Sequence, residues 1–346
     1  MRACRIAELQ DVSAAPLRIA FLGSGFITKV HSRHLRSLRS DFSCAYASRE
    51  PGKAEALRRK YDGIASFTDY QRAIEDPRID AIVVAVPPHL HLDLTLSALQ
   101  AGKHVLVEKP AFPRRADFER AIQARTRAGR VVIVGENDHY KPLAVCLRRL
   151  LARGLIGDLV FTHVVSIAKR LKSADDWRND ESMAGGDAFF EEGIHWLHLA
   201  GSLGPRITRI HGLRPAVSRG GPDRRAKSML VAFQYDNGAV GSVYYSREIP
   251  SLFKGLRLSK LFGRRGVITF ESNGLLVLVR SVGLPRAIVP GVVDLRGYRA
   301  MYRDFAASIR DGRQPEMSLE RALDDHRLME QVYADADEPI APAAAR

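Results

Sequence analysis

Short apolar runs alternate with helical segments between Leu17 and Val134, and this alternation constrains the fold more than any other feature of the chain. Runs such as Leu17–Leu22, Ala81–Val86 and His104–Val107 are apolar almost throughout, which is typical of strands that helices cover on both faces. The segments between them have helical composition, for example Arg115–Ala128, which ends at a glycine. The alternation predicts a doubly wound parallel sheet of the α/β class.

The pattern changes beyond Asn137–Pro142. Alternating strands follow, a helix over Asp187–Leu203 interrupts them, and two helices close the chain. We therefore expect a second, α/β domain with an open, mostly antiparallel sheet. The expected boundaries give a flexible extension over residues 1–16, a nucleotide-binding domain over 17–138, a substrate and oligomerisation domain over 139–336, and a disordered tail over 337–346.

The chain is basic, with a formal net charge of +14 over 346 residues. The arginines are scattered and follow no nucleic-acid-binding motif, so an anionic small molecule is the favoured partner and nucleic acid is not. No apolar run reaches the roughly 18 residues of a membrane span, and no partner membrane is expected. Three cysteines without a paired spacing and a start without a secretory signal predict a cytoplasmic protein.

A glycine-rich loop stands between the first strand and the first helix. Gly23 permits a tight turn, and Gly25 lets the backbone approach a pyrophosphate at the helix N-terminus, followed by Phe26 and Ile27. Thr28 replaces the third glycine of the usual pattern, so its hydroxyl either widens the helix–strand contact or faces a phosphate. The alternative is a glycine turn without a ligand.

The end of the second strand predicts which dinucleotide is bound. NAD-selective proteins carry an acidic residue there, whereas this chain has Ser48 and Arg49. A cation and the lack of a repelling carboxylate favour the 2′-phosphate of NADP, with NAD possible. The alternative is that Arg49 is a solvated surface residue.

A charged triplet, Glu108-Lys109-Pro110, ends a buried strand at the edge where open α/β sheets bind ligands. Lys109 there could bind a hydroxyl or carbonyl oxygen and share its proton. Pro87 and His91 end the preceding strand at the same edge, where the prolines can wall a nicotinamide. His89 and His91 could hold a metal, but a third ligand is not in sight and structural roles are favoured.

Glu191, His195 and His198 stand at i, i+4 and i+7 of the helix expected over Asp187–Leu203, on one face. Glu191 could accept the ring proton of His195 and fix its tautomer, so that the other ring nitrogen acts as a general acid or base. A metal site and a plain amphipathic helix rim are the alternatives.

Together these motifs resemble the Gfo/Idh/MocA family of oxidoreductases, over nearly the whole chain from Leu17 to about Ala334. The segments from Gly102 to Pro110 and from Ala85 to His91 carry the resemblance most specifically. It implies a Rossmann domain and an α/β domain whose sheet forms a homodimer or tetramer. It also implies that Lys109 is the catalytic lysine and His195 the proton-transfer residue. Glu191 stands where the family usually has Asp, and His198 where it often has another.

The cofactor contacts expected from these motifs are Gly23, Gly25, Phe26, Ile27, Ser48, Arg49, Pro87, His91, Glu108 and Lys109. The resemblance also implies that Trp177 and Arg178 border the substrate pocket, with Glu191, His195, His198 and Lys109. The expected reaction is hydride transfer between NADP(H) and a hydroxyl or carbonyl carbon of a sugar, cyclitol or related polyol. The alternatives are a non-catalytic NAD(P)-binding sensor or scaffold and an NAD-dependent glycosidase of the same family. No metal is expected.

Overall fold

The computed structural model describes residues 15–170, 180–215, 227–251 and 257–336. The chain divides into two compact units, which adjoin in the sequence at Ala85 and Val86. The extension expected over residues 1–16 lies almost wholly outside the described residues, and the tail expected over 337–346 lies outside them entirely. The expected domain boundary at residues 138 and 139 stays a prediction.

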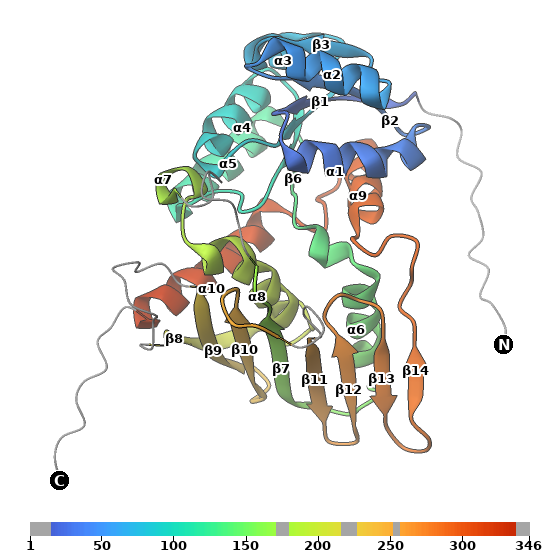
Figure 1. Ribbon diagram of the computed structural model, residues 1–346, viewed down its shortest axis with the longest axis vertical. Coiled ribbons are helices and arrows are strands. Elements are labelled where there is room, and N and C mark those ends of the chain that lie inside the picture. Colours follow the sequence, from blue (N-terminus) through green and yellow to red (C-terminus); the bar gives the residue numbers. More distant parts are fainter. Residues whose placement is uncertain (1–14, 171–179, 216–226, 252–256, 337–346) are drawn as a thin grey trace. The chain divides into compact units, whose positions relative to one another are not determined.

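The described part of the first unit, residues 15–85, contains four strands and three α-helices (Figure 1). Strand β1 pairs in parallel with β2 on one side and with β4 on the other, and β2 pairs with β3. Residues Ile19–Leu22 of β1 are fully buried, as expected for a strand in the middle of a helix-covered sheet. The elements are β1 (Leu17–Leu22), α1 (Phe26–Leu35), η1 (Arg36–Leu38), β2 (Phe42–Ala47), α2 (Pro51–Tyr61), β3 (Ala65–Phe67), α3 (Tyr70–Glu75) and β4 (Ala81–Val84).

The second unit begins with the remaining two strands of this sheet. The six strands follow the order β3-β2-β1-β4-β5-β6, which is that of a Rossmann fold. The predicted doubly wound parallel sheet is therefore confirmed. The elements are η2 (Pro88–Leu90), α4 (His91–Gln100), β5 (His104–Val107), α5 (Arg115–Ala128), β6 (Val132–Val134), η3 (Asn137–Tyr140) and α6 (Pro142–Ala152).

The described residues beyond α6 contain an eight-stranded sheet, in the order β14-β13-β12-β11-β7-β10-β9-β8. Among its described strands only β7 and β10 pair in parallel; the other pairs are antiparallel, so the sheet is mostly antiparallel, as predicted. The strands are β7 (Leu159–Ile167), β8 (Ile207–Leu213), β9 (Ser228–Tyr235), β10 (Val240–Ser246), β11 (Leu258–Gly263), β12 (Gly266–Glu271), β13 (Val277–Arg280) and β14 (Arg286–Ile288).

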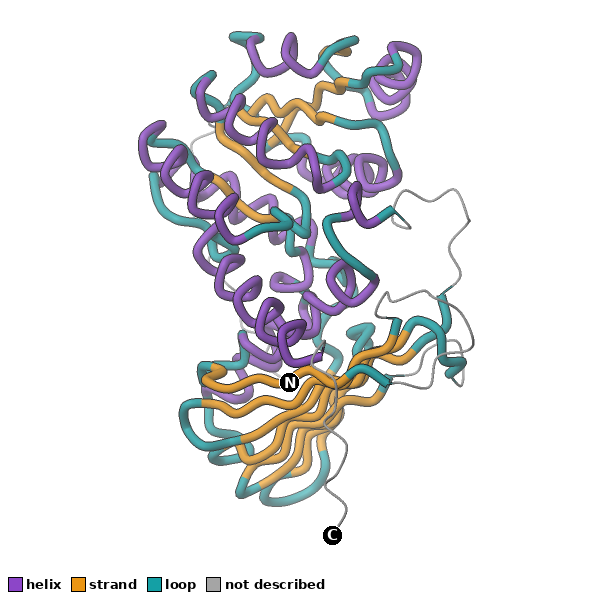
Figure 2. The backbone as a smooth tube through the Cα atoms, turned by 90° about the vertical axis from the view of Figure 1, so that its left-hand side faces the viewer, coloured by secondary structure: helices purple, strands orange, loops and turns teal. Residues whose placement is uncertain are grey.

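Helices cover one face of this sheet (Figure 2). Val164, Val231 and Val243 of the strands are fully buried against Leu197 of α8 and Val332 of α10. Alternate strand residues point to the opposite face, because side chains along a strand alternate. The helices of this unit not yet given are α7 (Glu181–Ala184), α8 (Ile194–Gly201), α9 (Tyr298–Asp311) and α10 (Leu319–Ala336). No described helix is long and apolar enough to cross a membrane.

One expected helix differs from the prediction. The segment predicted as a single helix over Asp187–Leu203 is a π-helical turn over Phe189–Gly193 followed by α8. A π turn inserts one extra residue per turn, so side-chain positions before it no longer share a face with those after it at α-helical spacing. This change of register alters the predicted active site.

Candidate active site

The glycine loop of the first unit has the backbone that its sequence predicts. Gly23 has a φ of 110°, a left-handed conformation that favours glycine. Gly25 stands at the N-terminus of α1, which no side chain caps, and a Cβ atom there would meet nothing within 4 Å. The first amide groups of α1 therefore face open space suited to an anionic phosphate.

Thr28 settles one alternative left open by the sequence. Its hydroxyl donates to the carbonyl of Gly23 over 2.8 Å, and the residue is fully buried. Thr28 therefore closes the loop onto itself and does not face a phosphate. Phe26 is 66% exposed at the start of α1, and Ile27 is half-buried.

Ser48 and Arg49 follow β2, as expected. The Ser48 hydroxyl lies 3.1 Å from that of Ser24 in the glycine loop and accepts the backbone N–H of Glu50. Ser48 thus ties the loop to the end of β2. Arg49 is exposed and hydrogen-bonds to Tyr70, which places its guanidinium beside an aromatic ring at the same end of the strand.

Lys109 follows β5 in the second unit and is half-buried. Its ammonium group donates to the main-chain carbonyl of Glu191 over 3.1 Å, which joins it to the π-helical turn. Glu108 beside it is 5% exposed and contributes to raising the pKa of Tyr298, after burial of that phenol. Lys109 therefore lies beside Glu108 and the main chain of Glu191, among titratable residues that all belong to the second unit.

His91 does not have the surface that a direct cofactor contact needs, and that prediction is wrong. The ring is 1% exposed, with Nδ1 2.9 Å from the carbonyl of Ala111 and Nε2 2.8 Å from that of Val86. Both ring nitrogens thus face main-chain carbonyls, that of Val86 just before Pro87 and that of Ala111 shortly after Lys109. His91 instead fixes the two loops in which those residues stand, and a metal-binding role beside His89 is disfavoured for the same reason.

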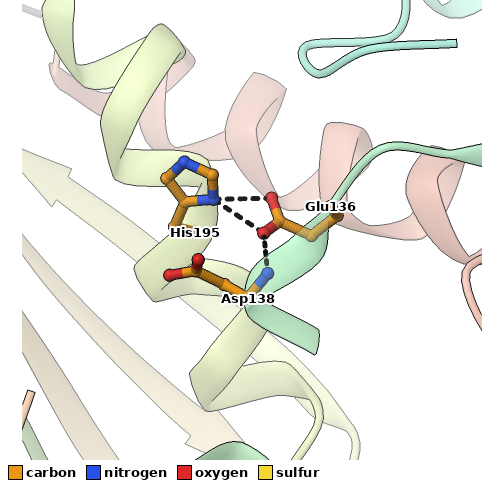
Figure 3. Close-up of side chains that lie close together, drawn as sticks. All are labelled: Glu136, Asp138 and His195. Carbon is orange, nitrogen blue, oxygen red and sulfur yellow. Dashed lines mark hydrogen bonds and ion pairs between the residues drawn. The ribbon is translucent and has the colours of Figure 1, made fainter. Parts of the chain in front are cut away.

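His195 pairs with Glu136, a residue that the sequence did not single out (Figure 3). Nδ1 of His195 lies 2.7 Å from each carboxylate oxygen, and the side chains are 17% and 4% exposed. Burial acts to raise the pKa of Glu136, but the charge and hydrogen bond of His195 outweigh it and leave that pKa below its ordinary value. An ionised Glu136 accepts Nδ1–H, so Nε2 carries the lone pair that can take a proton.

Asp138 completes the cluster. Its carboxylate lies 2.6 Å from the Lys141 ammonium group, and the backbone N–H of Asp138 donates to Glu136. Burial acts to raise the pKa of Asp138, but the charges of Lys141, His195 and Lys109 lower it to about 2. Asp138 therefore stays ionised and balances the cations around it.

Glu191 is not the carboxylate that holds His195, which corrects the prediction. The expected i, i+4 contact assumes a continuous α-helix, but the π turn contains Glu191 and ends before His195. Nδ1 of His195 bonds Glu136 from the segment after β6 instead. Glu191 contacts the site through its main-chain carbonyl, which accepts from Lys109.

His198 is buried among protein groups, so its predicted substrate contact is wrong. The residue is 2% exposed; Nδ1 lies 2.7 Å from Asp325 and Nε2 lies 2.9 Å from Nδ1 of His139. Because α8 is buried on most of its sides, His198, seven residues after Glu191, points into the core. Trp177 and Arg178 lie outside the described residues.

Atoms of Glu136, Asp138 and His195 lie within 4.8 Å of one another, a spacing at which they could hold a metal ion. Their ligand atoms are already engaged, because His195 bonds Glu136 and Lys141 bonds Asp138. A cation would have to displace both contacts, so the arrangement favours proton transfer.

Comparison with known proteins shows the class. A model described as "Oxidoreductase family, NAD-binding Rossmann fold" matches residues 17–136, and one described as "GFO/IDH/MocA C-terminal domain" matches residues 145–269. The chain belongs to the Gfo/Idh/MocA family of NAD-binding oxidoreductases. The predicted family, dehydrogenase class and nicotinamide-cofactor binding are confirmed at this level.

Several relatives are named as levoglucosan or inositol dehydrogenases. Levoglucosan dehydrogenase of Pseudarthrobacter phenanthrenivorans is 24% identical over 91% of this chain and 87% of its own length. Myo-inositol 2-dehydrogenase of Thermotoga maritima is 23% identical over 88% and 91%. The crystal structure of aldose-aldose oxidoreductase from Caulobacter crescentus has a TM-score of 0.83 at 22% identity and covers 93% of this chain and 97% of its own. This last likeness shows the fold.

Proposed function

We propose that the protein transfers hydride between NADP(H) and a CH–OH or carbonyl carbon of a sugar, cyclitol or related polyol. The observation that carries the proposal is the cluster in the second unit, where Lys109, His195 and the ionised Glu136 come together with one open ring nitrogen. The names of the relatives, which include levoglucosan and inositol dehydrogenases, support the substrate class.

His195, Glu136 and Lys109 have different roles in the proposed proton transfer. Among the described residues His195 has a hydrogen bond only at Nδ1, so Nε2 is placed to take the proton of a substrate hydroxyl. As the ring becomes cationic, Glu136 stabilises it at 2.7 Å. Lys109 binds the same oxygen and stabilises the alkoxide as it forms. When bound, the nicotinamide supplies the hydride acceptor or donor.

The preference for NADP(H) rests on the end of β2. Arg49 offers an exposed guanidinium, and Ser48 stands where an acidic side chain would repel a 2′-phosphate. The uncapped N-terminus of α1 fits the pyrophosphate of either cofactor. Calorimetric titration of the purified protein with NADPH and NADH tests the preference, and tighter binding of NADH would contradict it.

The free face of the eight-stranded sheet supports a homo-oligomer. It carries apolar side chains on neighbouring strands, and a patch of this kind usually marks an interface. The exposed residues include Phe161, Val240, Tyr244, Leu258, Phe262 and Leu278, which are 37–53% exposed. We propose that a second copy of the chain covers this face.

The test of the reaction is Lys109→Met. The purified variant is compared with wild type for NADP⁺ reduction on a panel that includes levoglucosan and myo-inositol, and for NADPH binding. We expect turnover to fall at least about a hundredfold while cofactor affinity stays within about threefold. Wild-type turnover in the variant would overturn the proposal. A cofactor-binding protein without activity on any polyol would favour the sensor, and product release without net cofactor reduction would favour the glycosidase.

A further inference from the structure

Four side chains next to the proposed catalytic pair form an unbroken chain of hydrogen bonds that the reaction does not use. Asp325 bonds Nδ1 of His198 over 2.7 Å, Nε2 of His198 meets Nδ1 of His139 over 2.9 Å, and Nε2 of His139 bonds Glu316 over 2.9 Å. Both imidazoles are 2% exposed. The Asp325 side chain is 10% exposed and that of Glu316 is 61% exposed, so the chain runs from the interior towards solvent.

The number of protons that these hydrogen bonds need determines the charge of the two imidazole rings. Three hydrogen bonds need three protons, whereas two neutral imidazoles carry only two between them. Without the third proton, lone pairs of His139 and His198 would face each other at 2.9 Å. A carboxylic acid is ordinarily about two pKa units more acidic than an imidazolium, so the third proton belongs to the rings. The histidine pair therefore carries one positive charge between two carboxylates.

The two rings have unequal shares of that charge. Burial acts to lower the pKa of His198, but Asp325 outweighs it and leaves that pKa above its ordinary value. Burial lowers the pKa of His139 to about 4, against the hydrogen bond that the ring donates to Glu316, which acts to raise it. His198 is thus the imidazolium, which donates through Nε2 to a neutral His139, and His139 donates to Glu316.

Other charges face the chain from the elements packed against it. Arg148 of α6 donates to the main-chain carbonyl of His139 over 2.8 Å. Arg321 of α10 acts on the pKa of both rings in the direction of lowering it, whereas the Glu136 carboxylate acts to raise that of His198. On α9, Asp304 bonds Tyr140 next to His139. The positive charge on the rings therefore has Glu136 as one of its partners.

The spacing of the residues in the sequence places the His139–His198 hydrogen bond alongside the contact between Glu136 and His195. Glu136 and His139 stand three residues apart at η3, and His195 and His198 stand three residues apart on α8. Residues at that spacing share one side of a helical turn. The two segments are therefore joined by two bridges side by side: Glu136–His195 and His139–His198.

We propose that His139 and His198 are positioning residues, and that the single proton they share holds η3 against α8 so that Glu136 keeps its contact with Nδ1 of His195. The proposal rests on the proposed function for its effect on turnover, but the shared proton is independent of it. Glu316 and Asp325 anchor the two ends of the pair.

Two substitutions at His139 separate the hydrogen bonds from the size of the ring. His139→Gln retains an acceptor for His198 and a donor for Glu316, whereas His139→Leu removes both. The matched control is His211→Gln, which makes the same substitution in an imidazole–carboxylate contact of 2.7 Å, between His211 and Asp335, at a surface position. Asp325→Asn provides a second route, because it keeps an acceptor for His198 but removes the charge.

The first measurement is nitrogen NMR of the histidine rings in the full wild-type chain at neutral pH. We expect three ring N–H protons over the two residues: both nitrogens of His198 and only Nε2 of His139. A pair with two ring protons would overturn the proposal, whether or not the enzyme's substrate is known.

The second measurement is turnover with a polyol that wild type oxidises. We expect kcat to fall roughly tenfold or more in His139→Leu and in Asp325→Asn with KM within about threefold, and to stay within about threefold in His139→Gln. His211→Gln should match wild type. Wild-type kcat in a folded His139→Leu, or in Asp325→Asn should that variant alone fold, would overturn the positioning role. Wild-type turnover in Lys109→Met would instead overturn the proposed function and leave the NMR result standing.

Discussion

Replacing Glu136 by glutamine tests the contact on which the proposed proton transfer depends. The amide of the Glu136→Gln variant would keep an oxygen within reach of His195 Nδ1 but would lose the negative charge that stabilises the imidazolium. Two unit charges about 4 Å apart interact by about 4 kcal/mol at an effective dielectric constant of about 20. Because the His195 and Glu136 side chains are 17% and 4% exposed, solvent screens only part of that interaction. We expect a loss of about 2–4 kcal/mol in the transition state.

That loss corresponds to a fall of roughly 30- to 1000-fold in kcat, at about 1.4 kcal/mol per factor of ten. The assay is NADP⁺ reduction with a polyol substrate, with NADPH affinity measured separately and expected to stay within about twofold. Glu191→Gln is the matched control, because it makes the same chemical change in the carboxylate that helical spacing favoured. A Glu136→Gln enzyme with wild-type kcat beside a disabled Glu191→Gln enzyme would refute the reasoning.

The charges and surfaces of the two units lead to three more expectations. Arg49→Ala should weaken NADPH binding by about tenfold and NADH binding by less than about twofold, as measured by calorimetry; equal losses would remove the argument for a 2′-phosphate contact. The buried His139 has a pKa of about 4, against an ordinary value of 6.5. A group whose pKa is lowered in the folded state contributes its full stability to the fold at a pH above its unfolded pKa, and the protein loses that contribution as the pH falls. Denaturant unfolding should therefore show that wild type loses about 3 kcal/mol more than His139→Gln between pH 6.5 and 4, whereas parallel curves would contradict a neutral buried ring. Phe161→Lys on the free face of the eight-stranded sheet should reduce the oligomer to monomers in light scattering with the thermal midpoint little changed, and an unaltered mass would place the interface elsewhere.

Local patterns were sufficient for most of the fold. The apolar runs predicted strands such as β1 and β5, and Arg115–Ala128 was predicted residue for residue as α5. The strands β3, β8, β11 and β14 were not predicted, because they are short or carry glycine and charged residues among the apolar ones, so little in the local sequence distinguishes them from loops. Of these, β11 pairs with β7, which is distant in the sequence, whereas β8 and β14 pair with β9 and β13, their neighbours along the chain.

In the candidate active site, too, local sequence patterns predicted some residues but not their partners. The sequence by itself singled out Lys109 and His195 as candidates, because one ends a buried strand, the other lies among charged residues of an expected helix, and both match motifs of the family that the chain resembles. It identified the glycine loop for the same reason, since a strand–turn–helix is a local structure. The sequence could also predict that a carboxylate would orient His195, because the chemistry requires one.

Only the tertiary structure decided which carboxylate that is. Glu136 is 59 residues from His195 in the sequence, and it reaches Nδ1 because η3 packs beside α8. The π turn at Phe189–Gly193 interrupts the spacing that favoured Glu191, and burial turns His91 and His198 from expected ligand contacts into structural ones. Local motifs are sufficient to predict which types of residue the chemistry uses. The partners of those residues depend on the packing of segments that are distant in the sequence, which no local pattern predicts.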